Sequence, residues 1–256
     1  IRRPPRSTPS NSSAASDVYK RQNKRLITSA VILDADLFMK YTGLEGKTLF
    51  LRVPNIFPVE NRKVVFMPIT KLRKDMRTPE NFWKMVNAIE KIAEEHKKEN
   101  GIIHCHSYEI AEELSKRLRL KGFKVITHGR KDRDEKFKEF IESKENPKVF
   151  ISVGFERGID LKYDLARWQV ITKVPFPDQD DPRVYELWVK RNAWNWARYQ
   201  TIKRLVQACG RIVRAEDDYG VTYILDAGFE HLFRYKKMFP AWFIDAVEQR
   251  EPITSR

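Results

Sequence analysis

Cysteine is scarce in this sequence of 256 residues, where only Cys105 and Cys209 occur. Two cysteines far apart exclude a disulfide framework and a four-cysteine metal site within the chain, and they indicate a reducing compartment. The sequence also lacks any apolar run close to the roughly 20 residues that a membrane span needs. We therefore expect a soluble, cytoplasmic protein with no membrane partner.

The glycine motifs of nucleotide binding are also missing. The stretch GLEGKT (43–48) resembles a phosphate-binding loop, but Tyr41 stands where this motif needs its first glycine. We read it as a turn. No G-x-G-x-x-G follows a predicted first strand, which argues against a dinucleotide-dependent enzyme. His104 and His106 offer two ligands where zinc needs three or four, so no metal site is predicted in this chain.

Acidic residues are outnumbered, with 35 Asp and Glu against 49 Lys and Arg, and the formal net charge is +14. Such a balance favours a polyanionic partner, although net charge governs association and not fold. Hydrophobic residues make up 41 % of the sequence and aromatic residues 12 %. This composition is typical of a globular domain with a true core and not of a disordered chain.

Residues 1–22 differ from the rest of the chain, since they are rich in Arg, Pro and Ser and nearly free of large aliphatic side chains. Such a segment is expected to be disordered. A basic nucleic-acid-binding tail and a mitochondrial presequence are two interpretations. The segment resembles, more closely, translated adapter sequence at the ends of open reading frames, so we exclude it from the fold. We therefore expect that the parent protein is truncated at its N-terminal side. Without it the net charge is still +10.

From residue 101 onward, short apolar segments alternate with segments of helical periodicity. Strands are expected at 101–105, 123–128, 148–152, 168–176 and 220–226. Helices are expected from the N-cap Ser107 to Gly122, at 132–143 and over roughly 183–215. The alternation predicts an α/β fold with a mainly parallel sheet flanked by helices, and ligands at the carboxyl ends of the strands. Residues 23–100 are less regular, with a connector at 53–62.

The stretch QACGRIVR (207–214) has two faces if the helix continues through it. An apolar stripe is formed by Leu205, Ala208, Cys209 and Ile212, and an opposite stripe by Gln207, Gly210, Arg211 and Arg214. Glycine inside a helix costs roughly 1 kcal/mol relative to alanine, so close approach of a ligand would explain it. Guanidinium groups suit phosphate or carboxylate oxygens. A solvated helix face remains the other interpretation.

Two further stretches are ambiguous by themselves. The segment 188–200 (WVKRNAWNWARYQ) interleaves aromatic side chains with cations. These side chains can stack on bases, but at helical spacing tryptophans more often pack against a sheet, and we favour packing. The segment 154–161 (GFERGIDL) follows a predicted strand and fits a nucleotide-facing loop, although such turns are common.

In order along the chain, five blocks resemble the second motor domain of superfamily 2 helicases of the XPD/DinG type. They are 26–38 (motif III), 55–62 (the linking segment), 101–114 (motif IV), 151–161 with 173–183 (motif V and the strand after it) and 207–229 (motif VI). The resemblance implies a RecA-like domain over 23–256, in which 23–100 holds motif III and the linking segment and 101–256 forms the core. It also implies an ATP-dependent DNA helicase of which this chain is the C-terminal half, inactive by itself.

The resemblance assigns roles to individual residues. It implies that Arg211 and Arg214 are catalytic arginine fingers that point toward ATP. The residues that would line the nucleotide are Gln207, Gly210, Gly158 and Asp160. Mg²⁺ and most of the ATP site would belong to an N-terminal motor domain that this chain lacks. A 4Fe-4S cluster in that part of the parent protein is left open.

The resemblance also implies coupling of ATP state to domain movement by Thr28 and Ser29, and contacts of Ser107 and Tyr108 with single-stranded DNA. In a prokaryotic host the parent would be nucleoid-associated, with a role such as DNA repair. Three positions depart from the family pattern, namely Arg157 in motif V, Val31 in motif III and Gly228 after motif VI. A non-catalytic, basic nucleic-acid-binding module remains the alternative.

Overall fold

The computed structural model describes residues 26–29, 31–44, 48–145, 147–154 and 161–251. The chain forms two compact units, residues 1–51 and 52–256, and each is described by itself. The segment 1–22 and the motif V residues Gly158 and Asp160 lie outside the described residues.

The first unit contains helix α2 (Ala35–Thr42). The Asp34 side chain caps its start by accepting a hydrogen bond from the Leu37 N–H at 2.8 Å. Gly43 ends it with a φ of 66°, in the left-handed region that glycine adopts without strain. Gly43, the first residue of the stretch 43–48, is therefore the C-cap of α2.

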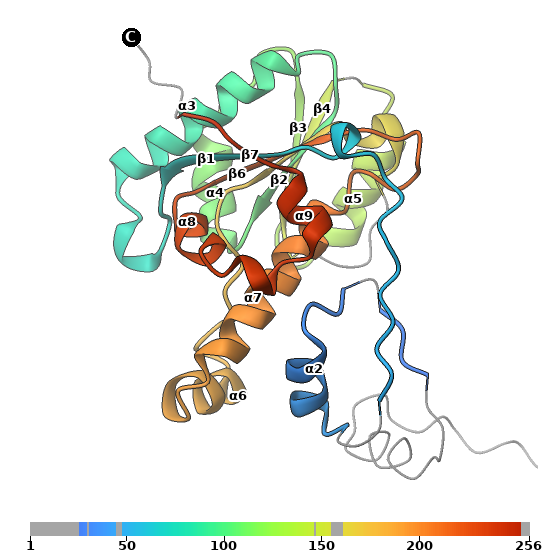
Figure 1. The fold of residues 1–256 in the computed structure, drawn as a ribbon. Helices are drawn as coiled ribbons and strands as arrows, with labels where there is room; N and C mark the ends of the chain where they lie inside the picture. The colour runs from blue at the N-terminus through green and yellow to red at the C-terminus, as the bar shows by residue number, and fades with distance from the viewer. Residues whose placement is uncertain (1–25, 30, 45–47, 146, 155–160, 252–256) are drawn as a thin grey trace, which may run out of the picture. The chain divides into compact units, whose positions relative to one another are not determined.

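A seven-stranded sheet forms the centre of the second unit, and every adjacent pair of its strands is parallel (Figure 1). The strand order is β3-β4-β2-β5-β6-β1-β7. The strands are β1 (Val64–Thr70), β2 (Gly101–Cys105), β3 (Lys124–Thr127), β4 (Lys148–Val153), β5 (Trp168–Ile171), β6 (Val221–Asp226) and β7 (Val247–Gln249). The five predicted strands are all present, although β5 is shorter than expected, and the α/β prediction is confirmed.

Helices cover both faces of this sheet. The α-helices of the second unit are α3 (Pro79–Glu95), α4 (Tyr108–Arg117), α5 (Arg133–Glu142), α6 (Pro182–Val184), α7 (Trp194–Cys209), α8 (Gly228–Phe233) and α9 (Ala241–Asp245). A π-helical segment, η4 (Tyr185–Lys190), follows α6 directly. Short 3₁₀ turns are η1 (Val59–Asn61), η2 (Lys74–Met76), η3 (Tyr163–Leu165) and η5 (Lys236–Met238). Among the described residues, no helix is long and apolar enough to cross a membrane.

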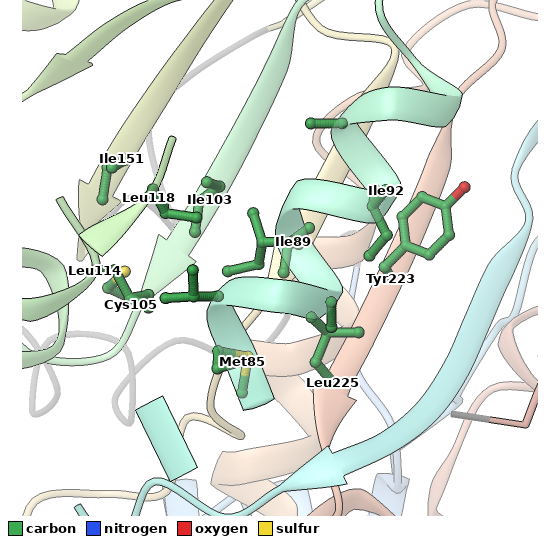
Figure 2. Packing of buried hydrophobic residues seen from close by; sticks show 14 of the residues in the cluster. Met85, Ile89, Ile92, Ile103, Cys105, Leu114, Leu118, Ile151, Tyr223 and Leu225 are labelled. Atoms are coloured by element: carbon green, nitrogen blue, oxygen red, sulfur yellow. The ribbon is translucent and has the colours of Figure 1, made fainter. Parts of the chain in front are cut away.

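Helices α3 and α4 pack on one face of the sheet and form the larger core (Figure 2). Met85, Ile89 and Ile92 of α3 are fully buried at the spacing of one helix face. They meet Tyr223 and Leu225 of β6 in this cluster. Thr78 caps the start of α3 through its side chain, with Pro79 in the first turn. Transfer of this apolar surface from water is the main contribution to folding.

The opposite face is covered by α5, by the end of α7 with the loop after it, and by α8 and α9. Phe140 of α5 packs with Phe150 of β4 in a second buried cluster, which also contains Ile212 and Val213. Phe229 of α8 meets Phe66 of β1 with ring centroids 5.0 Å apart. Helices on both faces of a parallel sheet make a doubly wound domain.

The expectation that residues 23–100 are irregular is wrong in its second half. This region contributes strand β1 and the 17-residue helix α3. The apolar spacing of α3 was present in the sequence but lies among many charged residues, which obscured it. Strand β1 contains Pro68, a residue that argues against an inner strand.

The expectation of one helix over 183–215 is also wrong. The π-helical segment η4 ends at Lys190, and Asn192 has a φ of 51° in the left-handed region, which separates η4 from α7. Helix α7 then ends at Cys209. In Figure 1, α6 and the first half of α7 project away from the sheet.

Candidate functional site

Helix α7 ends inside the stretch that carries the predicted arginines. The Gly210 N–H donates to the Val206 carbonyl at 3.1 Å, and the Arg211 N–H donates to the Ala208 carbonyl at 3.2 Å, which tightens the last turn. The chain then leaves the helix so that Ile212 and Val213 are both buried. Both side chains join the buried cluster that contains Phe150 and Leu161.

The predicted polar stripe is therefore correct only up to Gly210, and Arg211 and Arg214 lie in a loop. Arg211 is half-buried and Arg214 is exposed. The Arg214 guanidinium lies 3.5 Å from the Gly210 carbonyl oxygen. The Gln207 side-chain oxygen is buried and has no hydrogen-bond partner among the described residues. A buried amide oxygen without a partner is costly, so its position calls for a donor that the described residues do not supply.

Gly210 has no steric requirement within the described chain. A Cβ at this position would lie 3.6 Å from the Val206 carbonyl oxygen, an ordinary van der Waals contact. The φ of Gly210 is −83°, which any residue adopts. The absence of a side chain here is thus not explained by packing among the described residues.

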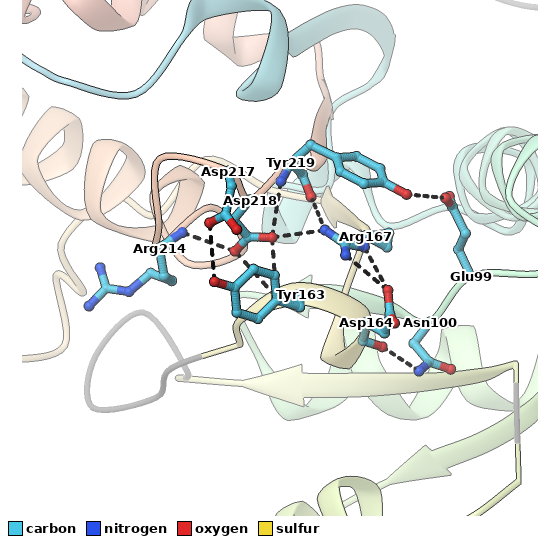
Figure 3. A network of polar contacts seen from close by, with 9 residues as sticks. All are labelled: Glu99, Asn100, Tyr163, Asp164, Arg167, Arg214, Asp217, Asp218 and Tyr219. Carbon is cyan, nitrogen blue, oxygen red and sulfur yellow. Dashed lines mark hydrogen bonds and ion pairs between the residues drawn. The ribbon is translucent and has the colours of Figure 1, made fainter.

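The loop after α7 is held by the buried carboxylate of Asp218 (Figure 3). One of its oxygens accepts a hydrogen bond from the Arg214 N–H at 3.1 Å. Both oxygens lie 3.2 Å from the Tyr163 N–H, and one accepts from the Arg167 guanidinium at 2.8 Å. Charge-assisted bonds of this kind are the stronger ones in proteins. Asp218 therefore ties the arginine-bearing loop to the chain before β5.

Arg167 completes this network and is 8 % exposed. It donates to the Asp164 carboxylate at 2.9 Å and to the Tyr219 carbonyl at 2.9 Å. Its guanidinium carbon lies 3.9 Å from the centre of the Tyr219 ring. Neither Arg167 nor Asp218 was a candidate from sequence, because an ion pair between distant segments has no local pattern.

A second group of predicted residues follows strand β2. Ser107 caps α4 as expected, since its hydroxyl accepts from the Ile110 N–H at 3.3 Å. The Tyr108 ring lies 4.6 Å from the guanidinium carbon of Arg130, which is exposed. The ring of His128 meets Tyr108 edge-on at 5.8 Å. Arg130 was not predicted from the sequence, because it has no signal beyond its charge.

The two groups lie at opposite ends of the sheet. The Arg167 N–H donates to the Asn100 carbonyl, directly before β2, so the network that holds the arginine loop lies at the amino ends of the strands. Ser107 and Tyr108 lie at the carboxyl end of β2. Of the predicted site residues, Ser107 and Tyr108 therefore lie at the carboxyl edge of the sheet and Arg214 at the amino edge.

The predicted motif V residues precede Leu161, which is fully buried in the same cluster as Ile212 and Val213. The chain after motif V thus packs directly on the loop after α7. Thr28 and Ser29 are exposed in the first unit, where the Ser29 hydroxyl accepts from the Val31 N–H at 3.2 Å. Their coupling role stays a prediction.

The aromatic segment 188–200 divides between the two interpretations. Trp188 is buried and stacks on Phe176 with centroids 6.1 Å apart, as the packing interpretation expects. Trp194 is 51 % exposed and meets Trp188 edge-on. Trp194 and Arg198 line a cavity of about 440 Å³, together with Phe176, Trp188, Ala197, His231 and Leu232.

Cys105 and Cys209 are free thiols in the core, and burial raises the pKa of Cys105 to about 12. Within the described ranges, no group of His, Cys, Asp and Glu side chains is arranged to hold a metal ion. The His104 side chain instead bonds to Gln169, and His106 bonds to the Phe176 carbonyl at 2.9 Å.

Curated helicases are similar to this chain over part of its length. The ATP-dependent DNA helicase DinG of Photobacterium profundum is 27% identical over 126 residues, which cover 46% of this chain and 18% of that protein. The regulator of telomere elongation helicase 1 of Bos taurus is 28% identical over 99 residues, covering 33% of this chain and 8% of that protein. The chain thus matches less than a fifth of the length of either relative.

Comparison with solved structures gives the same type of fold. An apo XPD structure has a TM-score of 0.58 at 21% identity and covers 75% of this chain and 40% of that chain. S. cerevisiae Dbp5 bound to RNA and ADP BeF3 has a TM-score of 0.54 at 15% identity, covering 87% and 49%. The sheet and its flanking helices are therefore RecA-like.

The family model described as helicase C-terminal domain matches residues 89–246, which is more than half of the chain and includes the sheet from β2 to β6, α4, α7 and the arginine loop. This chain belongs to that family and is a C-terminal motor domain of the XPD/DinG type of superfamily 2 helicase.

Proposed function

We propose that this domain supplies one side of an ATP site, opposite a second motor domain of the same helicase, and that it contacts single-stranded DNA at the other end of its sheet. The loop of Arg211 and Arg214 carries the proposal, because a buried network holds it in place beside Gln207 and Gly210. Mg²⁺ and the remaining phosphate contacts would come from the other domain, so this chain by itself would not hydrolyse ATP.

The chemistry of this loop suits a γ-phosphate. Phosphoryl transfer spreads negative charge over the transferring oxygens, and a guanidinium placed there accelerates the reaction by about 10³–10⁵. Asp218 fixes the Arg214 backbone through its N–H, so the position of the loop does not depend on the guanidinium. The unsatisfied Gln207 oxygen, which can only accept a hydrogen bond, suits a hydroxyl or amino group of a nucleotide.

Gly210 provides a test of close approach by the nucleotide. Gly210→Ala is expected to leave the thermal unfolding midpoint unchanged or slightly higher, because a Cβ would make only an ordinary contact 3.6 Å from the Val206 oxygen. ATP turnover by the full-length helicase is expected to fall about tenfold or more, since a 1 Å misplacement of reacting groups has effects of this size. Turnover and thermal unfolding are measured on the same preparation.

Unchanged ATP turnover in Gly210→Ala would remove the argument from close approach. If the full-length protein binds DNA without any ATP turnover, the chain would instead be a basic nucleic-acid-binding module.

The DNA contacts are proposed at the carboxyl ends of β2 and β3, on the Tyr108 ring and the exposed Arg130 cation. Aromatic rings stack on bases and cations bind phosphates, which together suit a single strand. The cavity beside Trp194 and Arg198 offers the same combination on the projecting α7. The excess of basic residues over the whole chain supports a polyanion as the partner.

Tyr108→Ala is expected to weaken binding of a fluorescent oligothymidine by about 5- to 100-fold, since stacking contributes about 1–3 kcal/mol per base. Arg130→Ala is expected to reduce the slope of log Kd against log salt by about one ion. Fluorescence anisotropy at several salt concentrations measures both. Lys98→Ala is the control, because Lys98 is exposed and precedes the amino end of β2. Equal small losses in all three variants would argue for diffuse electrostatic binding elsewhere.

A further inference from the structure

A buried row of polar side chains crosses the sheet beneath the end of α7. Ser152 of β4, His104 of β2, Gln169 of β5 and Thr222 of β6 come from four neighbouring strands and are all buried. They lie on the face that α7 covers. Four polar groups in an apolar layer are costly unless they bond to one another, so their arrangement calls for a physical reason.

Gln169 is the centre of this row. Its side-chain nitrogen lies 3.1 Å from the Ala208 carbonyl oxygen and 3.1 Å from the Cys209 carbonyl oxygen, and 2.7 Å from the Thr222 hydroxyl. Ala208 and Cys209 are the last two residues of α7. Carbonyl groups at a helix end have no partner within the helix and need donors from elsewhere.

The carbonyl groups at the end of α7 determine which way the Gln169 amide faces. A carbonyl oxygen can only accept, so the amide nitrogen must face α7 and the amide oxygen must face His104. That oxygen lies 3.0 Å from His104 Nε2, which therefore carries the hydrogen. The Ser152 hydroxyl lies 3.5 Å from the other ring nitrogen. Gln169 thus joins the end of α7 on one side to His104 of strand β2 on the other.

This arrangement replaces the usual glycine cap. Helices often end with a glycine in the left-handed region, which folds the chain back onto the last carbonyls. Gly210 has a φ of −83° and does not adopt that conformation. Gln169 from the sheet instead supplements the Arg211 N–H at the Ala208 carbonyl and provides a donor to the Cys209 carbonyl.

We propose that Gln169, bonded on its other side to His104, is a positioning residue that determines where α7 ends and thereby holds the Gly210–Arg214 loop in place for ATP hydrolysis. This inference rests on the function proposed above. Gln169 touches no substrate and acts through the backbone of α7. Asp218 holds the far side of the same loop, so the loop is anchored at both ends.

The test uses the full-length helicase with Gln169→Met, which keeps the side-chain length and removes the donors, and Gln169→Glu, which places a carboxyl group against two carbonyls. Gln249→Glu is the matched control, because Gln249 is an exposed strand glutamine in β7. Hydrogen exchange detected by mass spectrometry is followed over residues 205–214 and over β2. The kcat and KM for ATP are measured in parallel.

For both Gln169 variants we expect exchange over 205–214 at least about tenfold faster, with β2 unchanged, because opening is local to the helix end. The kcat is expected to fall about 10- to 100-fold at a nearly unchanged KM, since misplacement affects the transition state. Exchange that rises equally throughout the domain, or wild-type exchange and kcat, would overturn the proposal. If Gln169→Met does not fold, hydrogen exchange and kcat of Gln169→Glu test the proposal in the same way.

Measuring ATP turnover of Arg211→Ala in the same experiment distinguishes failure of the proposed loop function from failure of the Gln169 proposal. If Arg211→Ala is inactive while the Gln169 variants behave as wild type, only the positioning role of Gln169 is wrong. If Arg211→Ala retains full turnover, the proposed function of the loop is wrong, and the exchange measurement still reports whether Gln169 holds the end of α7.

Discussion

Arg211→Ala and Arg214→Ala are each expected to lower ATP turnover by the full-length helicase about 10³-fold or more, the size of effect that a guanidinium at the γ-phosphate has in phosphoryl transfer. The fold is expected to survive both changes. The structural bond from residue 214 to Asp218 uses the backbone N–H, which alanine retains, and the Arg214 side chain is exposed. The change in the free energy of unfolding should therefore stay within about 0.5 kcal/mol for Arg214→Ala.

Steady-state ATP turnover with saturating single-stranded DNA, together with thermal unfolding, measures this prediction. Arg250→Ala is the control for loss of one positive charge, because Arg250 follows the edge strand β7 and bonds only to Glu95 and to the Phe66 backbone among the contacts seen in the described part of the chain. Near wild-type turnover in both Arg211→Ala and Arg214→Ala would eliminate the arginine-finger role. A loss of turnover in the control variant would point to a general charge effect.

Asp218→Ala is expected to lower the free energy of unfolding of this domain by about 3–5 kcal/mol, the range for breaking a buried ion pair by removing one partner. Asp218 is fully buried, and the guanidinium of Arg167 remains in the core without its closest carboxylate. The backbone N–H groups of Tyr163 and Arg214 lose their acceptor as well. Unsatisfied buried donors add to the loss.

Urea denaturation followed by circular dichroism measures the change, and Asp217→Ala is the matched control. Asp217 is the adjacent carboxylate, is exposed, and accepts from the Tyr163 hydroxyl at 3.1 Å. Its removal is expected to change stability by at most about 0.5 kcal/mol. Similar small effects in both variants would show that the network of Figure 3 does not stabilise the domain.

Local patterns were sufficient for most of the fold. The strand at 101–105 and the helix that Ser107 caps were predicted within a few residues, because apolar β-branched runs and capping side chains act over short distances in the chain. Helix α3 was not predicted although its apolar spacing is regular, because many charged residues stand between its apolar positions. Strand β1 was missed for a physical reason, since Pro68 opposes its local preference and neighbouring strands override it.

For the candidate site, the sequence named residues but not their geometry. The Q-x-x-G-R-x-x-R spacing identified Gln207, Gly210, Arg211 and Arg214, but the two-sided helix inferred from it stops at Cys209. Periodicity assumes that the helix continues, but Gly210 is itself a helix-stop signal and occupies the C-cap position of α7. After Gly210 the chain turns, and Ile212 and Val213 join the buried cluster of Phe150 and Leu161.

By itself, the sequence determined the family, the α/β class and the residue types at both ends of the sheet, because ordered motifs and apolar periodicity are local properties. Only the tertiary structure decided that the arginines lie in a loop at the amino ends of the strands, held by Asp218 and Arg167 on one side and by Gln169 on the other. These contacts join segments that are distant in the chain. Their hydrogen bonds form only after the sheet has brought β5 and β6 together, so no local pattern encodes them.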